Sequence, residues 1–245
     1  MSTYKYYRIT ENIIQDINQG QLGEGEKNYF LFHRHRLEYI FSLLDEFNKN
    51  CSILNIGALF LHELLGAYFL GFRNLSGTDL SSFKPITAER AERIKAVIKD
   101  CDLEKEKLPF LDKTFDLVLL DETLEHFNFH PKKVFLEIAR ILKPGGRLII
   151  TTPNLVRLNN RLKCFLGKSI NYEIDADYTT ANHYREYTAA EIEYLLNVAG
   201  LKKAKLEYTD FDYPDRGRIE RIVNKAAGAF SQPLKPNIVM IGKKD

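Results

Sequence analysis

Short apolar runs alternate along the chain with longer stretches in which apolar side chains repeat every three to four residues. The short runs have the length of buried strands, and the longer stretches have the period of amphipathic helices. The strand-like runs are residues 51–57, 74–81, 96–102, 115–121, 146–154, 203–211 and 237–244. The helix-like stretches are residues 28–47, 60–70, 87–95, 131–142, 155–166, 188–199 and 216–229. This alternation predicts a parallel sheet with helices on both faces.

Local signals divide the chain further. Pro131 suits the first turn of helix 131–142, and Thr188 with Glu191 has the spacing of a capping box at the start of helix 188–199. The glycine-rich stretch 20–25 predicts a loop. We therefore expect an amino-terminal arm (1–27) and a single domain (28–245), which suits 245 residues of 44% hydrophobic content. The aromatic residues of the first 32 positions could close over a ligand or pack in a homodimer.

Composition and charge exclude few classes of function. Lys and Arg number 35 against 33 Asp and Glu, so charge gives no reason to expect a nucleic acid partner. The three cysteines, Cys51, Cys101 and Cys164, are too far apart for a zinc or redox motif and are interpreted as reduced core thiols. The chain shows no signal peptide and no apolar stretch of transmembrane length, which favours a cytoplasmic protein.

One block is specific enough to suggest a family. FDLVLLDETLEHF (115–127) and EIARILKPGGRLIITTPN (137–154), with 102–116 before them and 183–201 after them, resemble class I S-adenosylmethionine-dependent methyltransferases of the ubiquinone-biosynthesis type, the type 11 methyltransferase domain. The resemblance implies a Rossmann-like α/β fold with a seven-stranded sheet, mostly parallel with an antiparallel last strand. That number agrees with the strand-like runs counted independently.

The resemblance also implies S-adenosylmethionine as cofactor, S-adenosylhomocysteine as product, and a site at the strand ends. Asp79 corresponds to the acid that grips the ribose, Asp102 to the residue that reads adenine, and Asp121 and Glu122 to the end of the fourth strand. The full set of expected cofactor-binding residues is Asn55, Gly57, Ala58, Asp79, Leu80, Asp102, Leu103, Asp121 and Glu122.

The glycine loop departs from the family pattern. Only Gly57 remains, Leu59 and Leu61 stand where the second and third glycines belong, and Asn55 replaces a carboxylate. A leucine at a position of positive φ is strained, and its side chain would project toward the cofactor. Two interpretations stay open: the loop takes another path and still binds the cofactor, or it continues as a hydrophobic helix and the site is lost.

The candidate catalytic groups are His126 and His183, because imidazole is a base suited to removing a proton from the methyl acceptor near neutral pH. His126 is equally well interpreted as a turn residue. Glu122, Glu125, His126 and His183 also resemble the divalent metal site of small-RNA 2′-O-methyltransferases. The alternative is that Glu122 faces the cofactor and Glu125 caps a helix.

The region 155–187 is expected to form a lid over the acceptor, with His183, Tyr184 and Arg185 facing substrate. Its first part, 155–168, is amphipathic and basic without an acidic residue. It could cover the site, face an anionic or lipid-linked substrate, or contact a membrane surface; the alternative is a lid helix with solvated charges.

The leading functional hypothesis is a biosynthetic methyltransferase that methylates oxygen on a small molecule or a sugar or glycan intermediate. The second hypothesis is a catalytically inactive methyltransferase-fold protein that acts as a binding or assembly partner. The third is a metal-dependent RNA 2′-O-methyltransferase. Leu59 and Leu61 favour the second hypothesis. The first is favoured by Asp79, Asp102, Glu122 and His126.

Overall fold

The chain folds around one seven-stranded sheet, seen in a computed structural model that describes residues 2–20, 23–80, 85–170, 183–214 and 217–245. The strands are β1 (Ser52–Ile56), β2 (Asn74–Asp79), β3 (Val97–Asp100), β4 (Phe115–Asp121), β5 (Leu142–Pro153), β6 (Leu201–Thr209) and β7 (Asn237–Lys244). Their order is β3-β2-β1-β4-β5-β7-β6. The pairs from β3 to β5 are parallel, and β7 runs antiparallel to both neighbours. The predicted fold class is confirmed.

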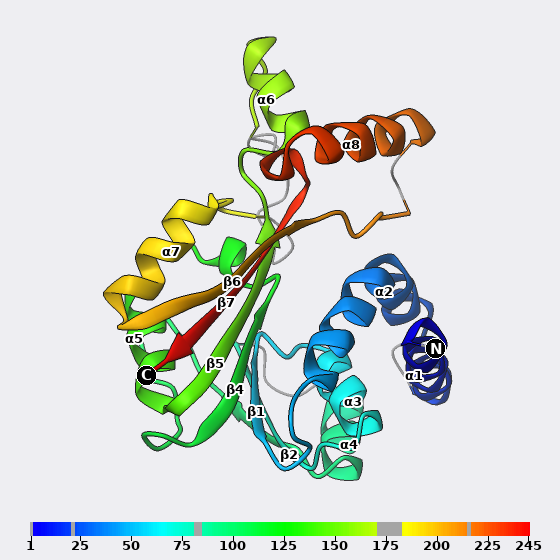
Figure 1. Cartoon of the computed structure of the whole chain (residues 1–245). Helices are drawn as coiled ribbons and strands as arrows, with labels where there is room; N and C mark the ends of the chain where they lie inside the picture. The colour runs from blue at the N-terminus through cyan, green and yellow to red at the C-terminus, as the bar shows by residue number, and fades with distance from the viewer. Residues whose placement is uncertain (1, 21–22, 81–84, 171–182, 215–216) are drawn as a thin grey trace.

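Helices cover both faces of the sheet (Figure 1). They are α1 (Ser2–Gln19), α2 (Gly23–Asp45), α3 (His62–Phe69), α4 (Pro85–Arg93), α5 (Lys132–Ile141), α6 (Leu158–Phe165), α7 (Ala189–Val198) and α8 (Arg218–Phe230), with short 3₁₀ turns η1 (Leu124–His126) and η2 (Gln232–Leu234). The helices α1 to α4 lie on one side, and α5 and α7 lie on the other. Thr188 caps α7 through the predicted box with Glu191.

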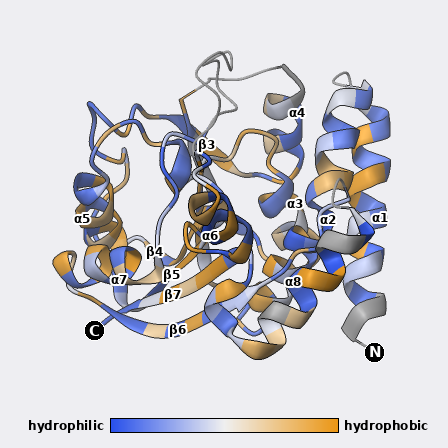
Figure 2. Ribbon diagram, turned by 90° about the horizontal axis from the view of Figure 1, so that it is seen from above, coloured by the Kyte–Doolittle hydropathy of each residue, from blue (hydrophilic) through white to orange (hydrophobic). Residues whose placement is uncertain are grey.

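Two apolar cores follow from this layering. In β1, Ile53 packs in the core beneath α1 to α4, whereas Leu54 and Ile56 pack in the core beneath α5 and α7. Alternate residues of a strand point to opposite faces, so a strand buried on both sides is apolar throughout. The strands β1, β4 and β7 are accordingly mostly apolar, and the outer helices carry apolar residues on one side and polar residues on the other (Figure 2).

The amino-terminal segment differs most from expectation. It is an 18-residue helix, α1, whose Ile9, Ile13 and Ile17 are buried in the same core as α2 and α3. Position 27, where the sequence suggests a division between arm and domain, lies inside α2. The helix forms because isoleucines four residues apart make one apolar stripe.

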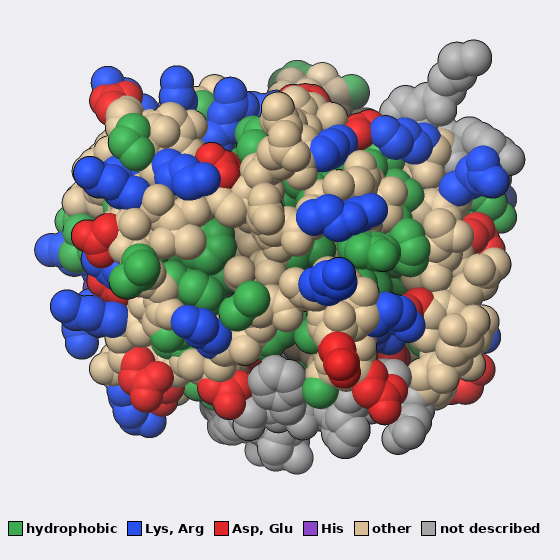
Figure 3. All heavy atoms as spheres, turned by 90° about the horizontal axis from the view of Figure 1, so that it is seen from below, with side chains coloured by type: hydrophobic (Ala, Val, Ile, Leu, Met, Phe, Trp, Pro, Cys, Tyr) green, Lys and Arg blue, Asp and Glu red, His purple; other side chains and the backbone are tan. Residues whose placement is uncertain are grey.

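The remaining surface gives few functional hints. None of the described helices is both long and apolar enough to cross a membrane. Lys and Arg side chains spread between apolar ones over the face at the amino ends of the parallel strands (Figure 3). All three cysteines are free, but Cys164 is exposed on α6, so its assignment to the core is wrong. Residues 171–182 of the expected lid lie outside the described residues.

Candidate functional site

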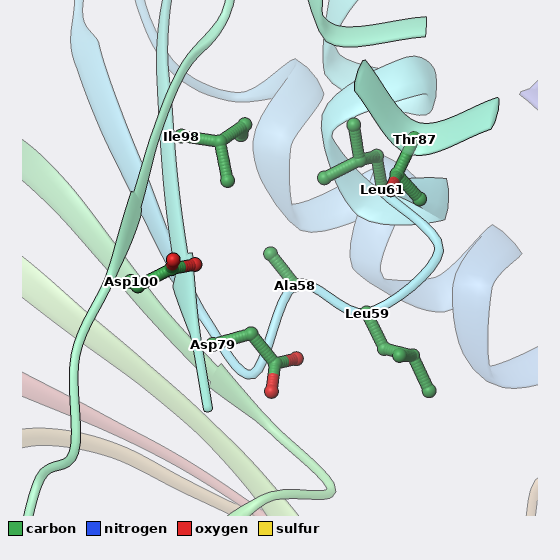
Figure 4. A pocket seen from close by; sticks show the side chains of 7 residues that line it. All are labelled: Ala58, Leu59, Leu61, Asp79, Thr87, Ile98 and Asp100. Atoms are coloured by element: carbon green, nitrogen blue, oxygen red, sulfur yellow. The ribbon is translucent and has the colours of Figure 1, made fainter. Parts of the chain in front are cut away.

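The carboxyl ends of β1, β2 and β4 form the crevice in which ligands bind in this kind of sheet, because chain order reverses between β1 and β4. On the β2 side lies a pocket shown in Figure 4. It is lined by Ala58, Leu59, Leu61, Asp79, Thr87, Ile98 and Asp100. Asp79 is the last residue of β2 and Asp100 is the last residue of β3, and the two residues are paired in the sheet. Two carboxylates at one pocket suit the hydroxyl and amino donors of a nucleoside.

Asp102 and Leu103 lie elsewhere. The Asp102 carboxylate accepts a hydrogen bond from the Lys105 ammonium at 2.7 Å and another from the Glu104 backbone N–H at 3.1 Å. Leu103 packs against the core beneath α5. Asp100, which the sequence analysis missed, lines this pocket, whereas Asp102 does not.

Gly57 is required by its surroundings. It has a φ of +80°, and a Cβ at this position would lie 2.5 Å from Oγ1 of Thr123. That hydroxyl donates to the Ile56 carbonyl at 3.1 Å, which ties the end of β1 to the turn after β4. Ala58 then packs over Gly77 of β2, where a Cβ would lie 2.9 Å from the Ala58 Cβ. The surviving part of the loop thus keeps the tight turn at the sheet edge.

The two leucines behave differently. Leu61 adopts the left-handed conformation (φ 59°, ψ 21°) immediately before α3, and it is buried in the core. Its predicted positive φ is therefore present. Leu59 is 38% exposed at the pocket rim. The loop turns before α3 begins at His62, so a hydrophobic helix is present but does not include residues 58–61.

A buried polar cluster fills the β1–β4 side of the crevice; its members are Arg36, Asn55, Glu63, Asp121 and Glu122, and we call it the Arg36 cluster. Nε of Arg36 lies 3.6 Å from Oδ2 of Asp121, and the Asn55 amide donates to Glu63 at 3.1 Å. Five buried polar atoms of this cluster find no hydrogen-bond partner among the described residues: Arg36 Nε and Nη1, Asn55 Oδ1, Asp121 Oδ2 and Glu122 Oε1. One unsatisfied buried group costs ~1–3 kcal/mol, so five together favour a polar ligand.

The pKa shifts of the groups in this cluster also favour a polar ligand. Burial, with the nearby Asp121 carboxylate, raises the pKa of Glu63 to about 8. Burial also raises the pKa of Glu122. Although burial opposes its charge, the Asp121 carboxylate raises the pKa of Arg36 well above its ordinary value. Several carboxyl groups therefore compete for one guanidinium, and a cationic ligand would relieve that competition.

His126 and His183 come together as predicted. Their ring centroids lie 5.0 Å apart although 57 residues separate them in sequence. The segment carrying His183 is held to η1 because the backbone N–H of Tyr184 donates to the Glu125 carbonyl at 2.9 Å. This geometry makes the two imidazoles neighbours at the edge where β4 ends.

Glu125 completes a group of metal-ligating type. One atom from each of Glu125, His126 and His183 lies within 4.8 Å of the others. The Glu125 carboxylate is fully buried and accepts from the Thr152 hydroxyl at 2.9 Å, so it contacts β5 and does not cap a helix. Burial and the neighbouring Glu122 raise its pKa well above the ordinary value. Glu186 faces Nδ1 of His183 at 3.8 Å, as an orienting partner of a histidine would.

The comparisons agree with this architecture. Residues 56–150 match the family model described as a methyltransferase domain. The uncharacterized protein MJ1123 of Methanocaldococcus jannaschii is 31% identical over 153 residues, which are 62% of this chain and 67% of that protein. An S-adenosylmethionine-dependent methyltransferase structure from Thermotoga maritima has a TM-score of 0.60 at 19% identity, covering 98% of this chain and 100% of its own. A chain in the Haloferax volcanii complex of a methyltransferase with its activator Trm112 has a TM-score of 0.64 at 18% identity, covering 90% and 94%.

The chain belongs to the class I S-adenosylmethionine-dependent methyltransferases.

The residues of this methyltransferase fit the cofactor that the family implies. Asp79 and Asp100 offer acceptors for the nucleoside at the pocket, and the Arg36 cluster offers both signs of charge where the methionyl end would lie. Sequence reasoning missed Arg36, Glu63 and Asp100. Arg36 had a signal: it stands four residues before Ile40 and seven before Leu43, on the apolar stripe of α2, where a charged residue is unusual.

Proposed function

We propose that this methyltransferase transfers a methyl group from S-adenosylmethionine to a hydroxyl oxygen of a small molecule or of a sugar or glycan intermediate. The observation that carries the proposal is the imidazole pair, His126 and His183, at the end of β4 beside the Arg36 cluster. A base at this edge would stand between the cofactor site and the region expected to form the lid. Hydroxyl acceptors need such a base.

When bound, S-adenosylmethionine supplies the methyl group as an electrophile attached to a sulfonium. His126 or His183 would accept the proton of the acceptor hydroxyl as its oxygen takes the methyl group from the sulfonium, so the proton would end on the imidazole. Glu186 orients His183 through Nδ1, and Asn160 holds Glu186 through a hydrogen bond of 3.0 Å. Because the base is already held in a fixed orientation, less conformational entropy is lost in reaching the transition state.

Helix α6 is proposed as the lid over the acceptor. Its apolar side chains include Phe165, which is 87% exposed, and Leu162, which is 49% exposed, and Arg161 lies among them. This surface supports an acceptor with an apolar portion, an anionic or lipid-linked substrate, or contact with a membrane surface. The sugar or glycan intermediate would then carry an apolar anchor.

A second candidate is metal-assisted methylation at Glu125, His126 and His183, favoured by their spacing within 4.8 Å. Two imidazoles and a carboxylate suit a divalent transition metal, which would lower the pKa of a bound acceptor hydroxyl. An RNA acceptor is supported only by this group and is disfavoured by the formal net charge of +2. Loss of methyl transfer on dialysis against a chelator, restored by Mn²⁺, would favour this candidate.

The test combines binding with transfer. S-adenosylmethionine and S-adenosylhomocysteine should each raise the melting temperature in a concentration-dependent way, as mass action requires. Labelled methyl groups should then pass to hydroxylated sugar or lipid-linked acceptors, and His183→Ala should reduce the rate at least ~100-fold. His130→Ala, which changes an exposed histidine of a nearby loop, is the control and should keep the wild-type rate. Binding without transfer to any acceptor would favour the inactive binding partner, and no thermal shift would overturn the enzyme proposal.

A further inference from the structure

Arg36 is an unusual residue to find beneath a cofactor crevice. It comes from the middle of α2, outside the loops that build the site, and it is 1% exposed. Its Nε and Nη1 find no hydrogen-bond partner among the described residues, and its ion pair with Asp121 is 3.6 Å long. Nε faces Asp121, whereas Nη1 lies on another edge of the planar guanidinium and keeps a donor for an oxygen of an anionic ligand.

The groups around Arg36 have the opposite character. Glu63 from α3 and Asp121 from β4 place acceptor oxygens beside it, and Oδ2 of Asp121 and Oδ1 of Asn55 have no hydrogen-bond partner among the described residues. These oxygens suit an ammonium group, which has three donors and no acceptor. A buried site with one guanidinium and several carboxyl groups therefore matches a ligand that carries both an anion and a cation.

The glycine loop explains why such a site is needed. Leu59 and Leu61 replace two glycines whose backbone would otherwise approach the ligand, and Asn55 replaces a carboxylate. Glu63 lies against Asn55, so the missing carboxylate is supplied from the first turn of α3 instead of the end of β1.

We propose that Arg36 binds the α-carboxylate of S-adenosylmethionine, and that Glu63 and Asp121 bind its α-ammonium. Recognition of the amino-acid end has thus moved from the glycine loop to α2 and α3. The inference rests on the proposed cofactor and assigns residues to it that the family pattern does not supply.

Three nucleosides that differ in their amino-acid end test this proposal. S-adenosylhomocysteine carries both the carboxylate and the ammonium, S-adenosyl-3-thiopropylamine lacks only the carboxylate, and 5′-methylthioadenosine lacks the whole amino-acid end. Titration calorimetry on the full chain should show S-adenosylhomocysteine binding at least tenfold tighter than S-adenosyl-3-thiopropylamine. Equal affinity for these two ligands would overturn the role of Arg36 while leaving nucleoside binding intact.

Variants then test whether the difference in affinity between these two ligands depends on the Arg36 side chain. Arg36→Lys keeps the buried positive charge but loses the Nη1 donor, so it should remove most of the preference for the carboxylate and leave the affinity for S-adenosyl-3-thiopropylamine within threefold. Arg90→Lys is the matched control, because Arg90 is equally buried but contacts Glu26 and Asp16. The control should keep the wild-type ratio of affinities. A ratio that falls equally in both variants would mean that Arg36 acts only through stability.

The outcomes separate this inference from the function on which it rests. If none of the three nucleosides binds the wild-type chain, the proposed function and the inference both fail. If all three bind with equal affinity, the chain still binds the nucleoside and only the inference fails. Since the wild-type comparison needs no variant, the inference remains testable even if Arg36→Lys does not fold.

Discussion

Leu61 packs in the core although its backbone adopts a strained, left-handed conformation. A left-handed conformation costs a leucine ~1–2 kcal/mol relative to glycine. Burial of the side chain, which is 1% exposed, contributes more than that, because truncating a buried leucine costs ~2.7–5 kcal/mol. The residue therefore stabilises the core while occupying the place of a family glycine.

Restoring glycine at the two leucine positions should have opposite consequences. Leu61→Gly should lower the free energy of unfolding by ~1–3 kcal/mol, because lost burial exceeds relieved strain. Leu59→Gly changes a side chain that is 38% exposed at the pocket, so it should leave stability within ~1 kcal/mol. It should also tighten nucleoside binding at least threefold by clearing the rim. Urea denaturation and calorimetry measure both effects.

Leu111→Gly is the control for these two variants, since Leu111 is 83% exposed and does not line the pocket. It should change neither nucleoside affinity nor, beyond ~1 kcal/mol, stability. Weaker nucleoside binding by Leu59→Gly would mean that Leu59 contacts the ligand favourably and that the altered loop is an adaptation.

At the residue level the sequence predicted most site residues at strand ends, although it missed Asp100 at the end of β3, and it missed those that belong to helices. Asp79 and Asp121 end β2 and β4, so the strand pattern alone brings them to one edge of the sheet. Arg36 and Glu63 belong to helices, and their approach depends on how α2 and α3 pack across the sheet. No local spacing encodes that packing, because it is a product of tertiary contacts.

Among the elements, α2 is held to its neighbours by a buried charge network. The Glu26 carboxylate accepts from the Arg90 guanidinium of α4 at 2.7 Å and lies 2.9 Å from Nε2 of His62 in α3. Arg90 also donates to the Phe60 carbonyl at 2.8 Å, so the same network holds the loop after β1. One carboxylate thus joins three helices beside the pocket.

Glu26→Gln should be strongly destabilising. Removing the charge leaves the buried Arg90 with Asp16 as its one remaining carboxylate partner among the described residues, and breaking a buried pair costs ~3–5 kcal/mol. Glu24→Gln is the matched control on the same turn of α2: its pair with Lys27 is 3.4 Å long and its side chain is 79% exposed. The control should change the free energy of unfolding by less than ~1 kcal/mol. Similar losses in the two variants would show that the network contributes little.

The elements themselves were the most predictable level. All seven strands and the helices α2 to α8 follow the runs of apolar residues, with ends that shift by a few residues. The helix α1 escaped notice because its polar residues outnumber its apolar ones, although the isoleucine spacing indicated it. Strand order was not predicted from the sequence pattern, because the alternation of elements implies parallel pairing but does not say which strand lies at the centre.

Across the whole molecule, the sheet gathers acidic groups at one edge and buries them beneath α2. Burial, together with Asp121, raises the pKa of Glu63 from 4.5 to about 8, and burial raises the pKa of Glu122. A folded chain that holds protons which the unfolded chain has released becomes less stable as pH rises. The crevice therefore lowers the stability of the unliganded protein near neutral pH, which is the condition in which a cationic ligand would stabilise it most.

The pH dependence of unfolding tests this arrangement. Between pH 4.5 and about 8 the folded protein keeps the Glu63 proton while the unfolded chain loses it. The free energy of unfolding should therefore fall as pH rises through this window, by up to ~1.4 kcal/mol per pH unit for this one group. Glu63→Gln has no proton to lose and should show a shallower decline in urea denaturation. Glu89→Gln, an exposed change on α4, should keep the wild-type slope. If Glu63→Gln also keeps it, Glu63 is ionised in the folded protein, and Arg36 then neutralises more of the crevice than its distance of 3.6 Å from Asp121 indicates.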